Sequence, residues 1–218
     1  MNIKGAIFDM DGTLTDSMHV WSTIGSEFIK SCGKEPRDDV DRRFTSMSVY
    51  DAVDFMQREY GISGSRDEVT DAINKTVERR YLAEVPLKDG VEEFLSELHG
   101  MGVKMCVATA TDKYLADAAL TRLGIRKYFG EIFTSRSIGA GKEKPDIFYA
   151  ARDFLGTEIS ETAVFEDSYV AIDTAKAAGF PVCGLYDLSF AYKWDYIKEV
   201  SDIHATSIRE FLGKFTNE

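Results

Sequence analysis

A chain of 218 residues is long enough for one sizeable hydrophobic core and a smaller attached domain. Hydrophobic residues make up 44% and charged residues 29% of the chain, which is typical of a soluble globular protein and not of a disordered one. The net charge of −11, without any basic cluster, argues against binding to nucleic acid or to an anionic membrane, and any anionic substrate would need local cations.

The three cysteines are an odd number at wide spacings, so they predict reduced thiols and not a disulfide framework. Cys106 and Cys183 lie in apolar runs, which suggests burial. The N-terminus has no signal-peptide pattern, and no apolar run approaches the length that spans a membrane. We therefore expect a cytoplasmic protein, and we expect it to be a monomer or a weak homodimer.

The first predicted element is a short buried strand at 4–8, which ends at two acidic residues. Asp9 and Asp11 are two positions apart, and burying both in a core would carry a large desolvation cost. Beyond the end of the strand both can face one crevice, and Gly12 allows a sharp turn there. The pair indicates a divalent cation site, acid–base chemistry, or both, although a lone Asp-x-Asp also suits a strand end that caps a helix.

Residues 16–85 are predicted to form an all-helical insertion. Asp16 and Ser17 offer a helix cap, and a helical pattern follows to about residue 31. From 36 to 85 apolar residues recur near helical spacing, with a turn at 61–65 and no intervening strand pattern.

After residue 85 the pattern changes to alternating strands and helices. Repeated units of this length predict a parallel, doubly wound α/β sheet, formed by residues 1–15 and 86–218. Ligands of such sheets bind beyond the carboxyl ends of the strands. The predicted strands are 103–108, 131–135, 163–165 and 181–185, and the predicted helices are 91–100, 113–123, 145–155 and 170–178.

Hydroxyl groups follow the second predicted strand. The side chain of Thr109, together with the backbone N–H of Ala110 that follows it, could hold a phosphate oxygen. Threonine is also common in strands, so this position alone decides little. Thr111 is interpreted as a cap for the next helix.

Charged residues follow in two further places. Lys142 and Lys144 precede a predicted helix, and either could supply a cation to the site or could simply be solvated there. Glu166 and Asp167 end the strand at 163–165 as a second acidic pair. Because the carboxyl ends of parallel strands share one edge of the sheet, we expect these groups to gather near Asp9.

Together these segments resemble, in order, the four motifs of the haloacid dehalogenase-like phosphohydrolases. Helices between the first and second motifs resemble the helical cap of that family, and the resemblance covers nearly the whole chain. The sequence departs from the third motif by carrying Glu143 where a proline is usual. The matching strings are Asp9-Met10-Asp11-Gly12-Thr13-Leu14, Thr109, Lys142 before Pro145-Asp146-Ile147-Phe148, and Glu166-Asp167-Ser168.

The resemblance implies catalytic roles. Asp9 would attack phosphorus and form an aspartyl-phosphate, and Asp11 would protonate the departing alcohol and then activate water. Thr109, the backbone of Ala110 and Lys142 would hold and neutralise the phosphoryl group. An aspartate at position 11 favours phosphoesters over the halogenated or phosphonate substrates of related enzymes.

The resemblance also implies a Mg²⁺ ion held by Asp9, Asp167, the backbone carbonyl of Asp11, and Glu166 through water. Two like charges about 4 Å apart at an effective dielectric of about 20 repel by roughly 4 kcal/mol, so several carboxylates in one crevice need a cation. Mg²⁺ takes few carboxylates together with water and phosphate oxygens, which suits this set.

We therefore expect a phosphatase for a small phosphorylated metabolite such as a sugar or polyol phosphate. The cap is most similar to that of the β-phosphoglucomutase-like branch, and a phosphosugar mutase is the first alternative. The mutases carry a histidine that aligns with Trp21 and an arginine that aligns with Val49 in Met47-Ser48-Val49, so both departures favour hydrolysis. A non-catalytic binding or regulatory relative is the second alternative, but it predicts loss of Asp9, Asp11 or the lysine, and none is lost.

A few other residues are candidates for substrate contact. Trp21 is expected to line the substrate pocket or to pack at the cap hinge, and His19 lies two residues before it. His99 and His204 are expected at the surface. The aromatic run 186–196 is expected to pack under a loop, with a rim over the site or a contact surface as the alternative.

Overall fold

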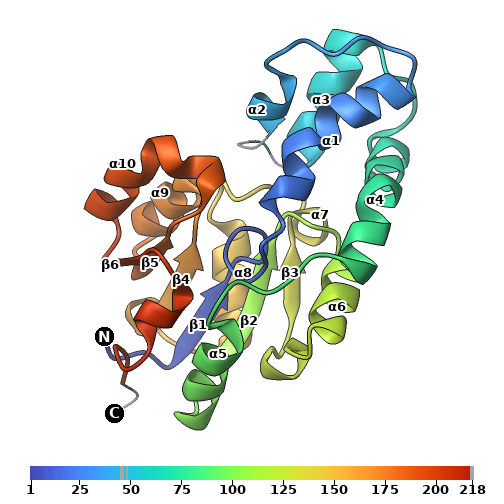
Figure 1. Cartoon of the computed structure of the whole chain (residues 1–218). Coiled ribbons are helices and arrows are strands. Elements are labelled where there is room, and N and C mark those ends of the chain that lie inside the picture. The colour runs from blue at the N-terminus through green and yellow to red at the C-terminus, as the bar shows by residue number, and fades with distance from the viewer. Residues whose placement is uncertain (45–46, 48, 217–218) are drawn as a thin grey trace.

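A six-stranded parallel sheet forms the centre of the computed structural model, which describes residues 1–44, 47 and 49–216 (Figure 1). The strand order is β3-β2-β1-β4-β5-β6, so the chain starts in the middle and winds outward in both directions. This confirms the predicted doubly wound α/β fold. The strands are β1 (Gly5–Phe8), β2 (Lys104–Thr109), β3 (Ile132–Thr134), β4 (Thr162–Glu166), β5 (Val182–Leu185) and β6 (Ile203–Ala205).

Helices cover both faces of this sheet, because successive side chains of each strand point to opposite sides. Ile7 packs with the cluster formed by α8, α9 and α10, whereas Phe8 packs with the cluster formed by α5 and α6. On that second side Phe8 stacks on Phe165 of β4 with ring centroids 4.4 Å apart. The helices are α5 (Val91–Gly100), α6 (Lys113–Arg122), α7 (Ser135–Ile138), α8 (Asp146–Leu155), α9 (Tyr169–Ala177) and α10 (Trp194–Val200), with 3-10 turns η1 (Arg126–Tyr128), η2 (Ile159–Glu161), η3 (Leu188–Lys193) and η4 (Ile208–Phe211).

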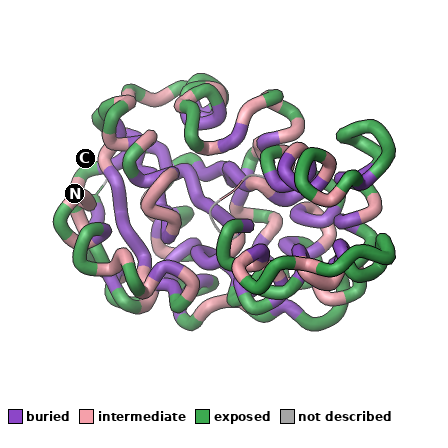
Figure 2. The backbone as a smooth tube through the Cα atoms, turned by 90° about the horizontal axis from the view of Figure 1, so that it is seen from above, coloured by how far each residue is buried: buried purple, intermediate pink, exposed green. Residues whose placement is uncertain are grey.

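Four helices between β1 and α5 lie together beyond the carboxyl edge of the sheet (Figure 1). They are α1 (Met18–Ser31), α2 (Val40–Phe44), α3 (Val49–Tyr60) and α4 (Arg66–Ala83). A capping box of Ser65 and Glu68 begins α4. Gly25 allows α1 to approach α2, since a Cβ there would lie 2.1 Å from the ring of Phe44. Figure 2 shows buried backbone through the interior of the molecule and exposed backbone around its outside.

The predicted elements are confirmed to within one or two residues up to β5, but the chain beyond Leu185 departs from the prediction. The segment after it forms η3 and α10 and then β6, a three-residue edge strand too short to show an alternating pattern. Ser17 is the N-cap residue of α1, as predicted, but its side chain makes no capping bond. Within the part of the chain that the structure describes, each helix is too short or too polar to span a bilayer.

Candidate active site

Acidic and hydroxyl residues from three neighbouring strands meet at the carboxyl edge of the sheet. Strand β1 lies between β2 and β4, so its end at Asp9 and Asp11 is flanked by Thr109 and by Glu166. The backbone N–H of Asp9 donates to the carbonyl of Phe165 at 2.9 Å, which carries the pairing of β1 and β4 up to the acidic residues. The topology therefore brings together residues that lie up to 157 positions apart, since it joins Asp9 to Glu166.

Three buried carboxylates form a cluster that suits a metal ion. One oxygen from each of Asp9, Glu166 and Asp167 lies within 4.8 Å of the others. The Oδ2 atoms of Asp9 and Asp167 are buried and make no hydrogen bond to any residue that the structure describes. Buried polar atoms are normally paired, and hard oxygen donors are what Mg²⁺ binds, so the two orphan oxygens fit a divalent cation.

The electrostatics of the cluster point the same way. Burial and the charge of Glu166 raise the pKa of Asp9 well above its ordinary value. Burial and the charge of Asp9 do the same to the pKa of Asp167. Both shifts indicate that the ionised forms of Asp9 and Asp167 are unfavourable unless a cation compensates for their charge.

The turn after β1 places the chain directly against this cluster. Gly12 has φ +94°, and a Cβ there would lie 2.3 Å from Oδ2 of Asp167. The neighbouring Thr13 donates from its hydroxyl to Oδ1 of Asp167 at 3.1 Å. A larger residue at position 12 would therefore displace the carboxylate that the turn helps to hold.

Lys142 is the lysine that reaches the cluster. Its Nζ donates to Oε2 of Glu166 at 2.8 Å and to Oδ1 of Asp9, and its side chain is only 11% exposed. Lys144 is exposed to solvent. Burial alone would lower the pKa of Lys142, but the charges of Asp9 and Glu166 outweigh it and raise that pKa above its ordinary value.

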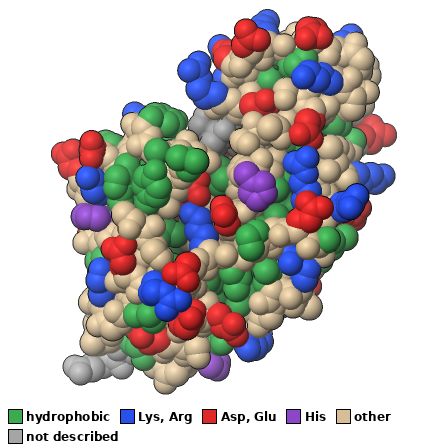
Figure 3. Space-filling view, viewed as in Figure 1, with side chains coloured by type: hydrophobic (Ala, Val, Ile, Leu, Met, Phe, Trp, Pro, Cys, Tyr) green, Lys and Arg blue, Asp and Glu red, His purple; other side chains and the backbone are tan. Residues whose placement is uncertain are grey.

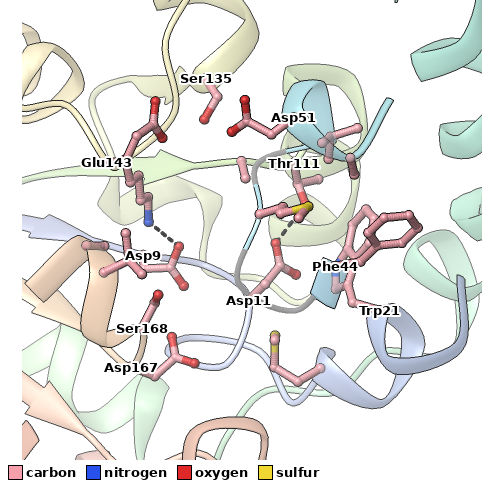
Figure 4. Close-up of a pocket in the computed structure, with 18 of the residues that line it drawn as sticks. Asp9, Asp11, Trp21, Phe44, Asp51, Thr111, Ser135, Glu143, Asp167 and Ser168 are labelled. Atoms are coloured by element: carbon pink, nitrogen blue, oxygen red, sulfur yellow. Dashed lines mark hydrogen bonds and ion pairs between the residues drawn. The ribbon is translucent and has the colours of Figure 1, made fainter. Parts of the chain in front are cut away.

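Hydrogen-bond donors surround the carboxylate of Asp11. Ser17 donates to its Oδ1 at 2.6 Å, and Thr111 donates to its Oδ2 at 2.7 Å, the bond drawn in Figure 4. The hydroxyl of Tyr81, at the end of α4, also donates to Oδ1 and accepts from the indole N–H of Trp21. Asp11 is thus held by residues of the helical segment as well as by the sheet.

A cavity of about 350 Å³ opens between these groups and the four helices (Figure 4). Of the predicted site residues, Asp9, Asp11, Trp21, Ala110, Lys142, Glu166 and Asp167 line it. Thr109 does not, because its buried hydroxyl accepts the N–H of Thr111 at 3.0 Å and lies 3.4 Å from Asp11. Thr111 lines the cavity, and the interpretation of this residue as a helix cap is wrong, since the N-cap of α6 is Asp112.

The three histidines lie away from the cavity, whereas Val49 is part of its wall. His19, His99 and His204 are exposed, as expected for the last two, and none of them lines it. Val49 lines the wall, whereas Ser48 lies outside the described residues.

Some residues of the aromatic run 186–196 pack in the interior, and others are exposed at the surface. Phe190 is buried and lines the cavity, and Trp194 packs edge-on against Tyr186. Leu188 and Tyr192 are exposed. Figure 3 shows hydrophobic side chains gathered on the surface at the upper left, in the region where Figure 1 labels α10. The expected packing role is therefore correct for part of the run, and the rim alternative holds for Phe190.

Several residues of the site carried no distinct signal in the sequence. Tyr81 lies on a helix at apolar spacing, so its hydroxyl could not be distinguished from ordinary packing. Ser135 follows β3, is buried, and is one of the residues that line the cavity. A search for hydroxyl residues at the end of each predicted strand would have found Ser135 but not Tyr81.

Comparison with known proteins supports the same group of enzymes. A family model described as haloacid dehalogenase-like hydrolase matches residues 3–179. The chain is 30% identical over 185 residues to the validoxylamine A 7'-phosphate phosphatase of Streptomyces hygroscopicus subsp. limoneus, covering 84% of this chain and 85% of that protein. It is 26% identical over 177 residues to the phosphorylated carbohydrates phosphatase of Thermotoga maritima, covering 81% and 82%.

A solved structure shares the fold. CbbY from Rhodobacter sphaeroides, in complex with phosphate, superposes with a TM-score of 0.80 at 20% identity and covers 96% of both chains. At this identity the likeness concerns the fold alone.

Proposed function

The chain belongs to the haloacid dehalogenase-like hydrolases, in the branch that contains phosphatases, and from this premise we propose that it hydrolyses phosphate monoesters of small metabolites, such as sugar or polyol phosphates, with Mg²⁺ and through an aspartyl-phosphate on Asp9. The observation that carries the proposal is the meeting of Asp9, Asp11, Lys142 and Asp167 around one cavity. In this proposal residues 16–85 are the cap, and residues 1–15 and 86–218 are the core that carries the chemistry.

Mg²⁺ would be held by Asp9, Asp167 and the backbone carbonyl of Asp11, with Glu166 acting through water. When bound, it would neutralise the carboxylates and the phosphoryl oxygens. The orphan oxygens of Asp9 and Asp167 support this set. Lys142 already contacts Asp9 and Glu166, so it would supply the second positive charge beside the phosphate.

Two steps then follow from the residues present. A carboxylate oxygen of Asp9 attacks phosphorus, the bond from phosphorus to the alcohol oxygen breaks, and Asp11 gives that oxygen its proton. Asp11 next takes a proton from water, which attacks phosphorus, and the bond to Asp9 breaks to release phosphate. The backbone N–H of Ala110 and the ammonium group of Lys142, two residues that line the cavity, would bind phosphoryl oxygens. Thr109 would support this strand end, since its hydroxyl accepts the N–H of Thr111.

The cap environment favours water as the final acceptor over a second sugar. Trp21, in the position of the mutase histidine, uses its N–H on Tyr81, and Val49 presents an apolar side chain to the cavity. Neither supplies the proton transfer or the positive charge that the mutase residues supply. Mutase activity is therefore an alternative outcome of the assay described next.

The decisive experiment is a panel of phosphate monoesters assayed for phosphate release with and without Mg²⁺, with Asp9→Asn as the control. We expect Mg²⁺-dependent release by the parent and none by the variant, whose melting curve should still be cooperative. Activity of Asp9→Asn within about tenfold of the parent would contradict covalent chemistry, since loss of a nucleophile costs far more.

Two other outcomes would support the alternatives. Isomerised product without phosphate release, from a hexose 1-phosphate with a bisphosphate primer, would indicate a mutase. A folded protein that releases phosphate from no member of the panel would indicate a non-catalytic relative.

A further inference from the structure

We propose that the cavity selects phosphate monoesters whose alcohol part donates hydrogen bonds and carries no negative charge, and that Ser135, Asp51 and Glu143 form the subsite that binds it. The inference rests on the proposed function, because it names the substrate class of the same site.

Ser135 supplies the first observation. It begins α7, directly after β3, and is only 4% exposed. The residue lines the cavity, and its buried hydroxyl has no hydrogen-bond partner among the described residues. A buried hydroxyl without a partner costs free energy, and a polar group of a ligand in the cavity would remove that cost.

Two carboxylates line the same cavity as Ser135. Asp51 comes from the first turn of α3 in the cap, and Glu143 follows the lysine of the site. In the view of Figure 4 these two carboxylates and Ser135 are drawn on the opposite side of Asp9 from Asp167, and all three residues line the one cavity. Ionised carboxylates only accept hydrogen bonds, so their partners on a substrate must be hydroxyl or amino groups.

The charges around the cavity exclude a second anion. Among the described lining residues the acidic ones are Asp9, Asp11, Asp51, Glu143, Glu166 and Asp167, and the basic one is Lys142. The ammonium group of Lys142 is already engaged by Asp9 and Glu166. The three undescribed residues next to this wall in the sequence, Thr45, Ser46 and Ser48, are uncharged. A carboxylate or second phosphate on the alcohol part would therefore lie beside carboxylates without a cation of its own.

The rest of the cap wall supplies an apolar surface for the carbon skeleton. Trp21, Ile24, Phe44, Met56 and Ile73 line this side of the cavity. At about 350 Å³ the cavity lies near the lower end of small-molecule sites, which fits a metabolite and not a polymer. A compact polyhydroxy or amino alcohol with C–H faces matches both the wall and the acidic subsite.

The test compares glucose-derived phosphates whose sugar part carries no charge, a positive charge or a negative charge. The series is glucose 6-phosphate, glucosamine 6-phosphate, 6-phosphogluconate and glucose 1,6-bisphosphate, with p-nitrophenyl phosphate as a reference for the phosphatase reaction itself. We expect kcat/KM for glucose 6-phosphate and glucosamine 6-phosphate to exceed that for the two compounds with a second anionic group by about tenfold or more. This is the effect expected when that group lies beside the carboxylates of the cavity.

Variants assign the preference to the subsite. Asp51→Lys should raise kcat/KM for 6-phosphogluconate relative to glucosamine 6-phosphate by about tenfold, whereas Asp38→Lys, the same charge change at an exposed cap residue outside the cavity, should not. Ser135→Ala should raise KM for glucose 6-phosphate about fivefold, and the rise in KM for p-nitrophenyl phosphate should be smaller, because its aryl group donates no hydrogen bond. If Asp51→Lys does not fold, Asp51→Asn serves, with a weakened preference for the amine expected.

The outcomes separate this inference from the function on which it rests. Turnover of p-nitrophenyl phosphate with equal or better use of the anionic hexoses would overturn the subsite and leave the phosphatase in place. No release from any compound, by a folded protein with Mg²⁺, would overturn the proposed function. An equal response to Asp51→Lys and Asp38→Lys would trace the preference to net charge and refute the role of Ser135, Asp51 and Glu143.

Discussion

Replacing Tyr81 by phenylalanine removes one hydroxyl that links the cap to Asp11. An indole N–H can only donate, so the N–H of Trp21 points at the oxygen of Tyr81. The hydroxyl proton of Tyr81 is then directed at Oδ1 of Asp11. Tyr81 is fully buried, and phenylalanine fills the same volume. The substitution therefore tests the position of Asp11 with little change in packing.

The size of the effect follows from the bonds that remain. A hydrogen bond to a charged group contributes about 1.5–3 kcal/mol. Asp11 keeps the donors Ser17 at 2.6 Å and Thr111 at 2.7 Å, so the loss should lie at the lower end of that range. About 1.5 kcal/mol corresponds to roughly tenfold in the rate of the step that needs Asp11 as the acid.

Two classes of leaving group distinguish this role from a general loss of structure. An alkyl alcohol needs the proton of Asp11 to depart, whereas p-nitrophenolate is stable without it. Rapid-quench measurement of alcohol release should therefore show about a tenfold loss for an alkyl phosphate and less than about threefold for p-nitrophenyl phosphate. Tyr60→Phe is the matched control, because it removes a cap hydroxyl that accepts the N–H of Arg37 at 3.1 Å. Equal losses for both substrates, or none for either, would refute the reasoning.

Three further predictions concern the metal, the cap and the thiols. Burial and the charge of Asp9 raise the pKa of Asp167, so the metal-free protein loses stability as the pH rises through that pKa and Asp167 ionises. Without Mg²⁺, the melting temperature of Asp167→Asn should therefore be no lower than that of the parent. Only the parent should be stabilised by Mg²⁺, by about 2.7 kcal/mol when the Mg²⁺ concentration is 100 times Kd. Arg136 joins Asp71 of α4 to Asp112 of the core at 2.8 and 2.7 Å, so Arg136→Ala should loosen the cap and raise KM, and scattering that shows no expansion would count against this. Burial raises the pKa of the Cys106 and Cys183 thiols, so neither should react with a thiol reagent in the native protein even at a pH of about 9. The exposed Cys32 should react in the native protein.

The sequence was sufficient to predict the order of strands and longer helices up to β5, and the acidic edge of the sheet. Asp9 and Asp11 follow an apolar run, and Glu166 and Asp167 follow another, so their placement needs only the local alternation of strands and helices. Parallel strands carry their ends to one edge whatever the details of the loops. The sequence alone could therefore indicate which carboxylates form the acidic cluster.

Only the tertiary structure decided which side chains complete the site. Lys142 and Lys144 are two positions apart, and the path of one loop buries the first against Asp9 and leaves the second in solvent. Tyr81 reaches Asp11 across 70 residues, because α4 returns to the sheet at that point. Such contacts depend on the rotation of a helix and the course of a loop. Both are set by packing between distant segments, which no local pattern of residues records.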